Sequence, residues 1–466
     1  MGTVSTVGVQ RVWVVIASLA GWLGLLAWGV LGIVQEVRVL PSIWPHIAPP
    51  PAPPPTRGAI RAADGTPLAI SLPTGERLYP LGASAGQVIG YTERFRDRTQ
   101  NRVVYGAGLE GVERFAENKL AAGQDVYLTL DPVVQALAER ALWAGVAAAE
   151  AEWGSVVVME TQTGRLLAVA NAPAFDPATK RGQPGNDPRL LNYAFRYLIE
   201  PGSTLKVITA AALLEEGKAT LETRVEAPMQ RKVADAVIRD VVRHPETLTL
   251  AEVLAYSSNV GISTLAEALE PETLYRYFER LHLTDPDLLT PLYVERPLVN
   301  GPESWGPVEF ANATFGQGLA ITPLHLAAAF NAIANDGVFV RPSLFEPAGA
   351  PQTARVFQPE VARALREVLS AYNAPLARLE GYVLGGKTGT AQVAVDGRYS
   401  REVFTALYAG FVPADRPRAT VVVVLYHPRT SIYGSRVAAP IYRALAEGLL
   451  AYWGIPPERG KLVNGE

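Results

Sequence analysis

Ser203 and Lys206 lie three residues apart, directly after Pro201-Gly202, in an otherwise apolar stretch of the sequence. On a helix, Cβ atoms at this spacing are about 5–6 Å apart, so the lysine amine can reach the serine hydroxyl. A lysine can take the hydroxyl proton near neutral pH only when burial and nearby cations lower its pKa. The apolar neighbours predict that burial, and a helix start at Ser203 would favour a developing negative charge. The pair is therefore a candidate nucleophile and base, although a chain of 466 residues should contain about one S-x-x-K by chance.

Two further polar motifs follow along the chain. Ser257 and Asn259 lie between predicted helical segments, where the hydroxyl could relay a proton and the asparagine side chain could bind an amide. Lys387 and Thr388 begin a predicted strand, and a cation beside a hydroxyl could bind a carboxylate there. Gly389 and the glycines before Lys387 remove side chains where another group must approach. Each motif also has a structural interpretation, a helix cap for the first and an edge strand with a turn for the second.

The N-terminal part of the chain has the length and composition of a membrane-spanning segment. Residues 12–34 carry no charge and are long enough to cross a hydrocarbon layer about 30 Å thick. The run is longer than a signal-peptide core, so we expect a retained transmembrane helix rather than a cleaved signal. Arg11 lies in the tip, residues 1–11, which positive-inside reasoning places in the cytoplasm with the rest of the chain outside.

Beyond the predicted span, composition divides the chain into three further parts. Residues 35–56 are rich in proline, and Pro41–Pro55 should form a semi-rigid polyproline spacer rather than a helix. Residues 57–130 contain short apolar runs and turns typical of a small β-containing module. Residues 131–455 form the main domain, and residues 456–466 form a tail.

The main domain should contain one sheet built from distant segments. Asp131 and Pro132 are a cap and a first helical residue, so a long helix opens the domain. Two strands around Thr163-Gly164 follow, then a mainly helical middle, then strands from Gly386 to about residue 428 and a closing amphipathic helix. Strands at both ends of a helical insert imply a shared sheet.

Composition excludes several classes of function. An apolar share of 48%, a charged share of 19% and a net charge of −3 are typical of a globular protein without a field for binding nucleic acid. The chain has no cysteine and only five scattered histidines, which excludes disulfides, thiolate chemistry and the usual zinc spacings. We therefore expect chemistry based on oxygen and nitrogen, with no cofactor and no metal.

In this order, S-x-x-K, S-x-N and K-T-G resemble the motifs of the penicillin-recognising serine transferases, which include penicillin-binding proteins and class A β-lactamases. Longer segments are similar to the class B penicillin-binding proteins, among them GLEGVERFAENKLAAGQDVYLTLDP, FGQGLAITPLHLA and SRVAAPIYRAL. The likeness covers most residues from Arg57 to Tyr452. Glu200 before Pro201, and Asn259 in the second motif, resemble the division-specific, FtsI-type branch.

The resemblance implies an α/β fold of the α+β type, with a mixed, mainly antiparallel sheet, helices on both faces, a helical subdomain and a small pedestal module. It implies a D,D-transpeptidase that cross-links peptidoglycan stem peptides ending in D-Ala-D-Ala and is inhibited by β-lactams. Ser203 would form the acyl-enzyme, and Lys206 would take its proton. Ser257 would relay protons to the leaving D-alanine, and Asn259 would orient the donor amide.

The third motif would hold the substrate. By the same resemblance, Lys387 and Thr388 would bind its terminal carboxylate, and Gly389 and Thr390 would complete the binding strand. The backbone N–H groups of Thr390 and Ser203 would stabilise the oxyanion. The resemblance also implies a plasma-membrane (inner-membrane) location with an extracytoplasmic catalytic domain, an FtsW-type glycosyltransferase as partner, and other division proteins.

Three features depart from this reading or compete with it. Ala62-Ala63 stand where the family often has Asp-Arg, and the module around them is short, which departs from the family pattern. Gly82 to Gly86 match G-x-S-x-G, but no strand precedes Ser84 and no helix pattern follows it, so we expect a turn. His325 lies on the apolar face of a predicted helix and should be a packed side chain rather than a base.

Several alternative functions fit the same motifs. A β-lactamase would share the nucleophile, but usually lacks an anchor, a spacer and a pedestal. A non-catalytic β-lactam sensor or scaffold would keep the fold without needing Lys206. An elongation-type class B transpeptidase would share the mechanism and differ in its place in the cell.

Overall fold

The computed structural model describes residues 6–43, 56–97, 102–179, 187–346, 349–395 and 398–457. The chain forms two compact units, Met1–Pro55 and Thr56–Glu466. The described part of the first unit is a single helix, α1, Thr6–Ile43.

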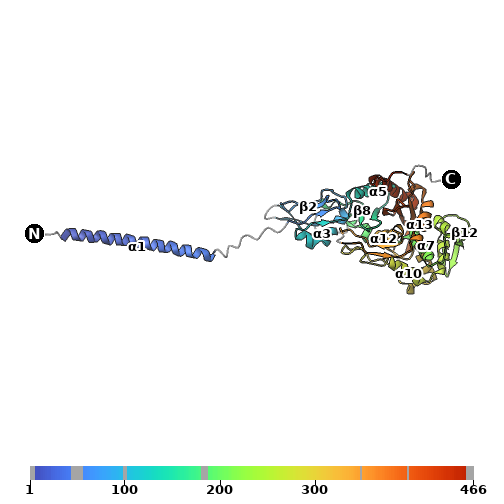
Figure 1. Ribbon diagram of the computed structural model, residues 1–466, viewed down its shortest axis with the longest axis horizontal. Helices are drawn as coiled ribbons and strands as arrows, with labels where there is room; N and C mark the ends of the chain where they lie inside the picture. The colour runs from blue at the N-terminus through green and yellow to red at the C-terminus, as the bar shows by residue number, and fades with distance from the viewer. Residues whose placement is uncertain are drawn as a thin grey trace. The chain divides into compact units, whose positions relative to one another are not determined.

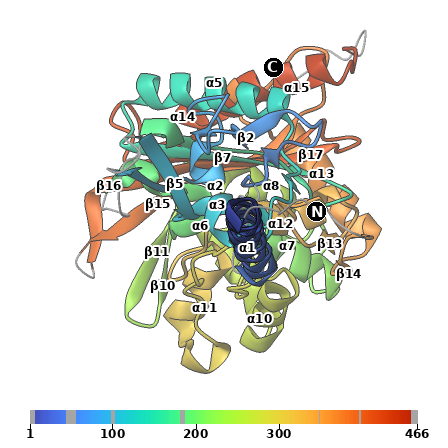
Figure 2. The same ribbon diagram turned by 90° about the vertical axis from the view of Figure 1, so that its left-hand side faces the viewer.

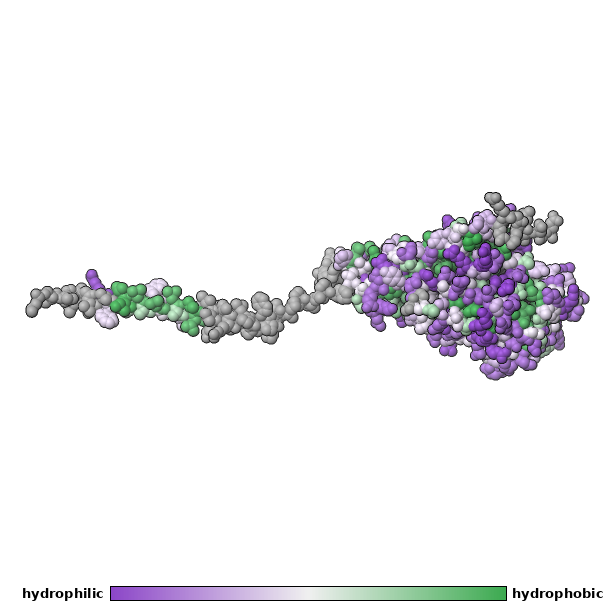
Figure 3. Space-filling model, in the orientation of Figure 1, coloured by the Kyte–Doolittle hydropathy of each residue, from purple (hydrophilic) through white to green (hydrophobic). Residues whose placement is uncertain are grey.

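Helix α1 contains the predicted membrane span. Its segment Trp13–Leu31 is long and apolar enough to cross a membrane by length and composition, and the hydrophobic side chains stand exposed along it (Figure 3). The helix continues to Ile43, so the prediction of a non-helical spacer over Pro41–Pro55 is wrong for its first residues, Pro41–Ile43. The physical reason lies in QEVRVL, residues 35–40, which contains neither glycine nor proline to stop the helix. The rest of the predicted linker, residues 44–55, lies outside the described residues.

The second unit begins with the predicted β-containing module. Four short strands form a sheet in the order β3-β2-β1-β6, in which β1 pairs with β2 antiparallel and with β6 parallel. Strands β4 and β5 form a separate antiparallel hairpin. The bounds are β1 Ile60–Arg61, β2 Pro67–Ser71, β3 Arg77–Leu78, α2 Gly86–Ile89, β4 Thr92–Asp97, β5 Arg102–Gly108, α3 Gly111–Phe115, α4 Glu117–Ala121 and β6 Val126–Tyr127. The module lies within the same compact unit as the main domain, and its boundary at residue 130 stays a prediction.

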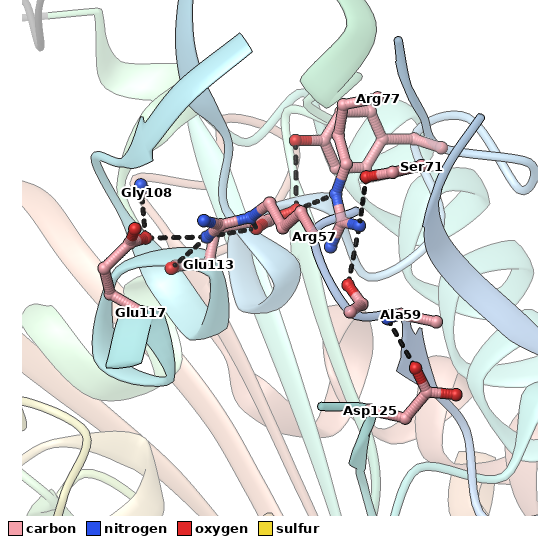
Figure 4. A network of polar contacts seen from close by, with 10 residues as sticks. Arg57, Ala59, Ser71, Arg77, Gly108, Glu113, Glu117 and Asp125 are labelled. Atoms are coloured by element: carbon pink, nitrogen blue, oxygen red, sulfur yellow. Dashed lines mark hydrogen bonds and ion pairs between the residues drawn. The ribbon is translucent and has the colours of Figure 1, made fainter. Parts of the chain in front are cut away.

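A buried ionic network holds the start of this unit to α3 and α4 (Figure 4). Glu113 accepts from Arg77 Nε at 2.7 Å and forms an ion pair with Arg57 at 2.8 Å. Arg57 also pairs with Glu117 at 2.7 Å, and Asp125 accepts from the backbone N–H of Ala59 at 2.8 Å. The side chains of Arg77 and Glu113 are fully buried, so each depends on the other to offset its lost hydration.

The main sheet has five strands in the order β15-β16-β17-β7-β8, and each pairing is antiparallel. The bounds are β7 Trp153–Glu160, β8 Leu166–Ala172, β15 Gly385–Val395, β16 Arg398–Val412 and β17 Ala419–Tyr426. Successive side chains alternate between two cores, as Val156 and Val158 face one side while Val157 and Met159 face the other. The predicted sheet of distant segments is confirmed, with antiparallel pairing throughout these five strands.

Helices cover both faces of this sheet (Figures 1 and 2). Helices α5, Pro132–Ala149, and α15, Ala439–Tyr452, lie on one face, and α12, Pro323–Ala334, packs on the other. Asp131 caps α5 by accepting from the backbone N–H groups of the first turn, as predicted. The expected fold class is confirmed.

The helical insert between β8 and β15 carries the motifs from the middle of the chain. Its helices are α6 Tyr193–Arg196, α7 Lys206–Glu215, α8 Leu250–Tyr256, α9 Asn259–Leu265, α10 Pro271–Arg280, α11 Pro307–Thr314 and α13 Pro359–Ala371, and α14 Gly434–Val437 lies after the sheet. Among its described residues are three two-stranded antiparallel sheets, formed by β9 Arg224–Glu226 with β12 Thr247–Thr249, β10 Gln230–Val233 with β11 Ala236–Arg239, and β13 Val338–Val340 with β14 Thr353–Arg355. Helix α7 therefore comes from the insert, while β15 is an edge of the main sheet.

Candidate active site

Ser203 lies in a short 3-10 turn, Gly202–Thr204, immediately before α7. The predicted helix thus begins one turn later than expected, at Lys206. Gly202 has φ of 53°, and a Cβ there would come within 3.2 Å of the Thr390 carbonyl oxygen. Its N–H donates to the Gly316 carbonyl at 2.9 Å. The positive φ and the close approach explain why the bend before Ser203 uses glycine.

Lys206 lies beside Ser203, as its spacing predicted. Its Nζ is 2.9 Å from Ser203 Oγ, 2.5 Å from the Ser257 carbonyl oxygen and 3.2 Å from Ser257 Oγ. The side chain is fully buried. Burial and the neighbouring Lys387 lower the pKa of Lys206 well below its usual 10.5, while Asp240 acts in the opposite direction. A neutral amine at this position can donate to the Ser257 carbonyl and accept the proton of Ser203.

Ser257 joins two helices in a left-handed conformation, with φ of 59° at the end of α8. The next residue, Ser258, caps α9 by accepting from the Gly261 N–H at 2.7 Å. Asn259 begins α9, and its Nδ2 donates to the Arg239 carbonyl at 2.9 Å. The cap interpretation of this motif holds for Ser258, while the hydroxyl of Ser257 faces Lys206.

Strand β15 brings the third motif to the same place. Lys387 is only 6% exposed, and its Nζ donates to Ser257 Oγ at 2.9 Å. Burial lowers the pKa of Lys387 to about 8. A Cβ at Gly389 would lie 3.0 Å from the Pro201 carbonyl oxygen, so the strand passes directly against the turn that holds Ser203. The Thr390 hydroxyl accepts from the backbone N–H of Gly434 at 3.3 Å.

A cleft of about 700 Å³ opens along these groups. Ser203, Ser257 and Asn259 line it on the helical side, and residues 388–390 line it on the strand side. The amine of Lys387 lies behind Ser257, so in this structure the cleft presents Thr388 and Thr390 rather than the lysine that we expected to bind a carboxylate beside Thr388. The remaining wall is largely apolar and aromatic, and it includes Val237, Val241, Val242, Phe315, Tyr399 and Tyr433.

Glu200 links the tip of the β15–β16 hairpin to the loop behind Ser203. Its Oε1 accepts from the Tyr399 hydroxyl at 2.7 Å and from the Gly318 N–H at 3.0 Å. Burial raises the pKa of Glu200. Glu200 could be noted from the sequence only through the family resemblance, and Tyr399, which is distant in sequence, carried no signal.

The two features that we set aside lie away from this cleft. Ser84 is in a turn, and its hydroxyl donates to Glu139 of α5 at 2.9 Å. His325 is fully buried in α12, where its ring nitrogens contact the Thr322 hydroxyl and the Asp285 carbonyl. Burial lowers the pKa of His325 to about 4. The interpretation of His325 as a packed side chain is confirmed. Ser84 lies in a turn as expected, but β3 precedes this turn and α2 follows it, so the expected absence of a strand and a helix around Ser84 is wrong. Among the described residues, no group of three or more His, Cys, Asp or Glu side chains is placed to bind a metal ion.

Comparison with known proteins identifies the class to which this fold and cleft belong. Residues 154–447 match the model of the penicillin-binding protein transpeptidase domain. The chain belongs to this family of serine-type transpeptidases. The match spans the sheet, the helical insert and the residues that line the cleft.

Relatives from several bacteria agree with the FtsI-type branch. The chain is 32% identical over 416 residues to the peptidoglycan D,D-transpeptidase FtsI of Escherichia coli, covering 82% of this chain and 68% of that one. It is 31% identical over 425 residues to the probable peptidoglycan D,D-transpeptidase PenA of Neisseria gonorrhoeae, covering 82% and 70%. The crystal structure of penicillin-binding protein 3 from Mycobacterium tuberculosis with ampicillin superimposes with a TM-score of 0.80 at 28% identity, covering 88% of this chain and 97% of that one. The expected class B, FtsI-type membership is thus supported in sequence and in structure.

Proposed function

We propose that this chain cross-links peptidoglycan stem peptides ending in D-Ala-D-Ala through an acyl-enzyme on Ser203, and that it does so at the division septum. The observation that carries the proposal is the buried Lys206 amine, 2.9 Å from Ser203 Oγ and within hydrogen-bond distance of Ser257. A nucleophile needs such a base beside it, and burial lowers the pKa of this amine well below its usual value, which favours the neutral form.

The first half of the reaction forms the acyl-enzyme. Ser203 Oγ attacks the carbonyl carbon of the penultimate D-alanine while its proton passes to Lys206. The backbone N–H groups of Ser203 and Thr390 hold the tetrahedral oxyanion. The C–N bond then breaks, and the proton returns through Ser257 to the amine of the leaving D-alanine.

The second half transfers the acyl group. The amine of another stem peptide attacks the ester carbon, its surplus proton returns by way of Lys206 to Ser203 Oγ, and a new amide replaces the ester. The donor peptide lies along β15, the edge strand of the main sheet, which offers unpaired backbone groups to an extended chain. Thr388 and Thr390 bind its terminal carboxylate, the positive charge of Lys387 attracts it from behind Ser257, and Asn259 orients the donor amide.

The same proposal places the enzyme in the cell. Helix α1 anchors the chain in the plasma membrane as a single span, with the catalytic unit on the extracytoplasmic side. An FtsW-type glycosyltransferase and other division proteins are the proposed partners, because the named relatives include FtsI. β-Lactams, which imitate the D-Ala-D-Ala terminus, are the proposed inhibitors.

Benzylpenicillin labelling tests the chemistry. Mass spectrometry of the treated full-length protein should find the adduct on Ser203, and Lys206→Ala should lose it. Lys218→Ala, at an exposed lysine that follows α7, is the matched control and should be labelled normally. An adduct that hydrolyses within minutes would favour a β-lactamase, and unchanged cell-wall cross-linking in Lys206→Ala cells would favour a scaffold.

Fluorescent penicillin labelling of cells with a tagged copy of the protein tests the place of action. A septal signal supports the division role, whereas a lateral signal contradicts it and favours an elongation-type enzyme.

A further inference from the structure

The loop after β11 holds the Ser257-Ser258-Asn259 motif through one carboxylate. Asp240 Oδ1 accepts from the backbone N–H groups of Asn259, at 2.5 Å, and Val260, at 3.1 Å. Asp240 Oδ2 accepts from the Ser258 hydroxyl at 2.5 Å. A carboxylate at the first N–H groups of a helix is stabilised by the helix dipole. Asp240 therefore fixes the start of α9, and with it the left-handed residue Ser257.

A fourth donor to this carboxylate is a histidine. His244 Nε2 lies 2.8 Å from Asp240 Oδ2, and the side chains of both residues are almost completely buried, at 0% and 1% exposure. The other ring nitrogen, Nδ1, lies 2.8 Å from the Pro245 carbonyl oxygen. The ring also packs at a tilt against Tyr256, with 5.8 Å between the ring centroids.

Both oxygen partners of the His244 ring are acceptors. The Pro245 carbonyl has no proton to give, and the oxygens of Asp240 already accept from two N–H groups and one hydroxyl. A neutral imidazole has one N–H, so it can satisfy only one of these two contacts. Only the imidazolium donates to both, which makes Asp240 and His244 a buried ion pair beside the catalytic groups.

The Asp240–His244 pair affects the protonation of Lys206 because the charge of Asp240 acts on the Lys206 amine. The groups that act on Lys206 are Lys387 from β15, which favours the neutral amine, and Asp240 from the loop after β11, which favours the protonated one. Among the described residues, Asp240 is the charged group that contacts the His244 ring. An imidazolium at 2.8 Å offsets most of the field of that carboxylate at other sites.

We infer that His244 is a positioning residue for acyl transfer, held as an imidazolium so that Asp240 can fix the Ser257-Ser258-Asn259 motif without retaining a proton on Lys206. The inference rests on the proposed function, in which Lys206 is the base. It assigns His244 an electrostatic role exerted through Asp240, without contact with the substrate.

His244→Gln tests the inference, because glutamine can still donate one N–H to Asp240 but carries no charge. The acylation rate of the full-length protein by a fluorescent penicillin is measured from pH 5.5 to 9.5. Without the imidazolium, Asp240 favours the protonated form of Lys206. The acid limb of the profile should therefore move to higher pH, slowing acylation about threefold or more at pH 6 while the high-pH plateau changes little. Asp240→Asn removes the carboxylate together with the partner that holds the imidazolium, so its acid limb should lie close to that of the wild type.

Arg243→Gln is the matched control. It removes one positive charge from the adjacent, exposed residue of the same loop, and its profile should coincide with that of the wild type. If His244→Gln is labelled on Ser203 with an unshifted acid limb, the inference is overturned and the proposed function stands. If the wild type is not labelled on Ser203, the proposed function itself fails.

Nitrogen-15 spectra of the full-length wild type supply a second measurement that does not require the glutamine variant to fold. One of the five histidines should keep both ring nitrogens protonated at pH 8, where an ordinary histidine is neutral. That signal should be lost in Asp240→Asn or in His244→Gln. Its absence from the wild-type spectrum would refute the buried ion pair.

Discussion

Replacing Lys387 with methionine should stabilise the protein while abolishing its activity. Burial is the cause that lowers the pKa of Lys387, from 10.5 to about 8. Each tenfold change in proton affinity is worth about 1.4 kcal/mol, so holding this ammonium in the folded state costs about 3 kcal/mol at neutral pH. Methionine is nearly as long and has no charge to bury, and it gives up one hydrogen bond to Ser257, worth about 1 kcal/mol. The net gain is about 2 kcal/mol, and the loss of charge beside Lys206 acts in the same direction.

The gain in stability from Lys387→Met should depend on pH, and the lowered pKa of Lys387 sets the direction of that dependence. Between pH 8 and 10.5 the unfolded chain binds more protons at Lys387 than the folded protein does, so the stability of the wild type rises with pH through this window. The advantage of Lys387→Met should therefore be complete below about pH 8 and gone above about pH 10.5. Thermal unfolding of the full-length protein should show a midpoint higher by about 2–4 °C at pH 7, since a chain of this size gains only a degree or two for each kcal/mol.

Lys218→Met is the control for this experiment, because the same substitution at an exposed lysine should give no pH-dependent difference. A Lys387→Met protein no more stable than the wild type at pH 7, or one whose advantage persists unchanged to pH 10.5, would refute the reasoning. Retained penicillin labelling at the wild-type rate would instead show that the charge of Lys387 is not needed for acylation.

Three further substitutions separate the catalytic groups from the scaffold. Gly389→Ala places a methyl group 3.0 Å from the Pro201 carbonyl oxygen, so β15 must move away and acylation should slow at least tenfold, as stopped-flow labelling would record; an unchanged rate would contradict this tight approach. Ser84→Ala removes one hydrogen bond to α5, and should cost about 1 kcal/mol in chemical denaturation while leaving the labelling rate intact. Arg77→Met leaves Glu113 buried without its main partner and should cost about 3–5 kcal/mol, seen as a lower unfolding midpoint; a loss below 1 kcal/mol would show that water reaches the site.

Much of the catalytic constellation could be predicted from the sequence because each motif is local. Ser203 and Lys206 are close along one turn, and Ser257 and Asn259 are two residues apart, so spacing alone sets what each pair can reach. The β-branched runs in β7 and β17 likewise predicted strands. Hydrophobic periodicity and helix caps are encoded within a few residues, and a single sequence therefore displays them.

The contacts that the sequence did not reveal join distant segments. Asp240 reaches Asn259 and Val260 across a hairpin and a helix, and nothing in the pattern around Asp240 marks it as a partner of that motif. The position of the Lys387 amine behind Ser257 depends on how β15 packs on the helical insert, which spacing does not specify. The extension of α1 into the proline-rich region shows a different limit, since a composition-based boundary does not locate the last helical turn.

The two sources of the catalytic groups have a mechanical consequence. Ser203, Lys206 and Ser257 belong to the helical insert, whereas Lys387 belongs to the outermost strand of a sheet whose interior is packed on both faces. The reaction thus takes place where the helical insert meets the edge strand of the sheet, within one compact unit. A shift of about 1 Å there would break the short contacts around Ser257 and slow the chemistry on the order of a hundredfold, with little change in heat stability. The turnover rate of this enzyme is therefore more sensitive to a displacement between the helical insert and β15 than any measurement of unfolding.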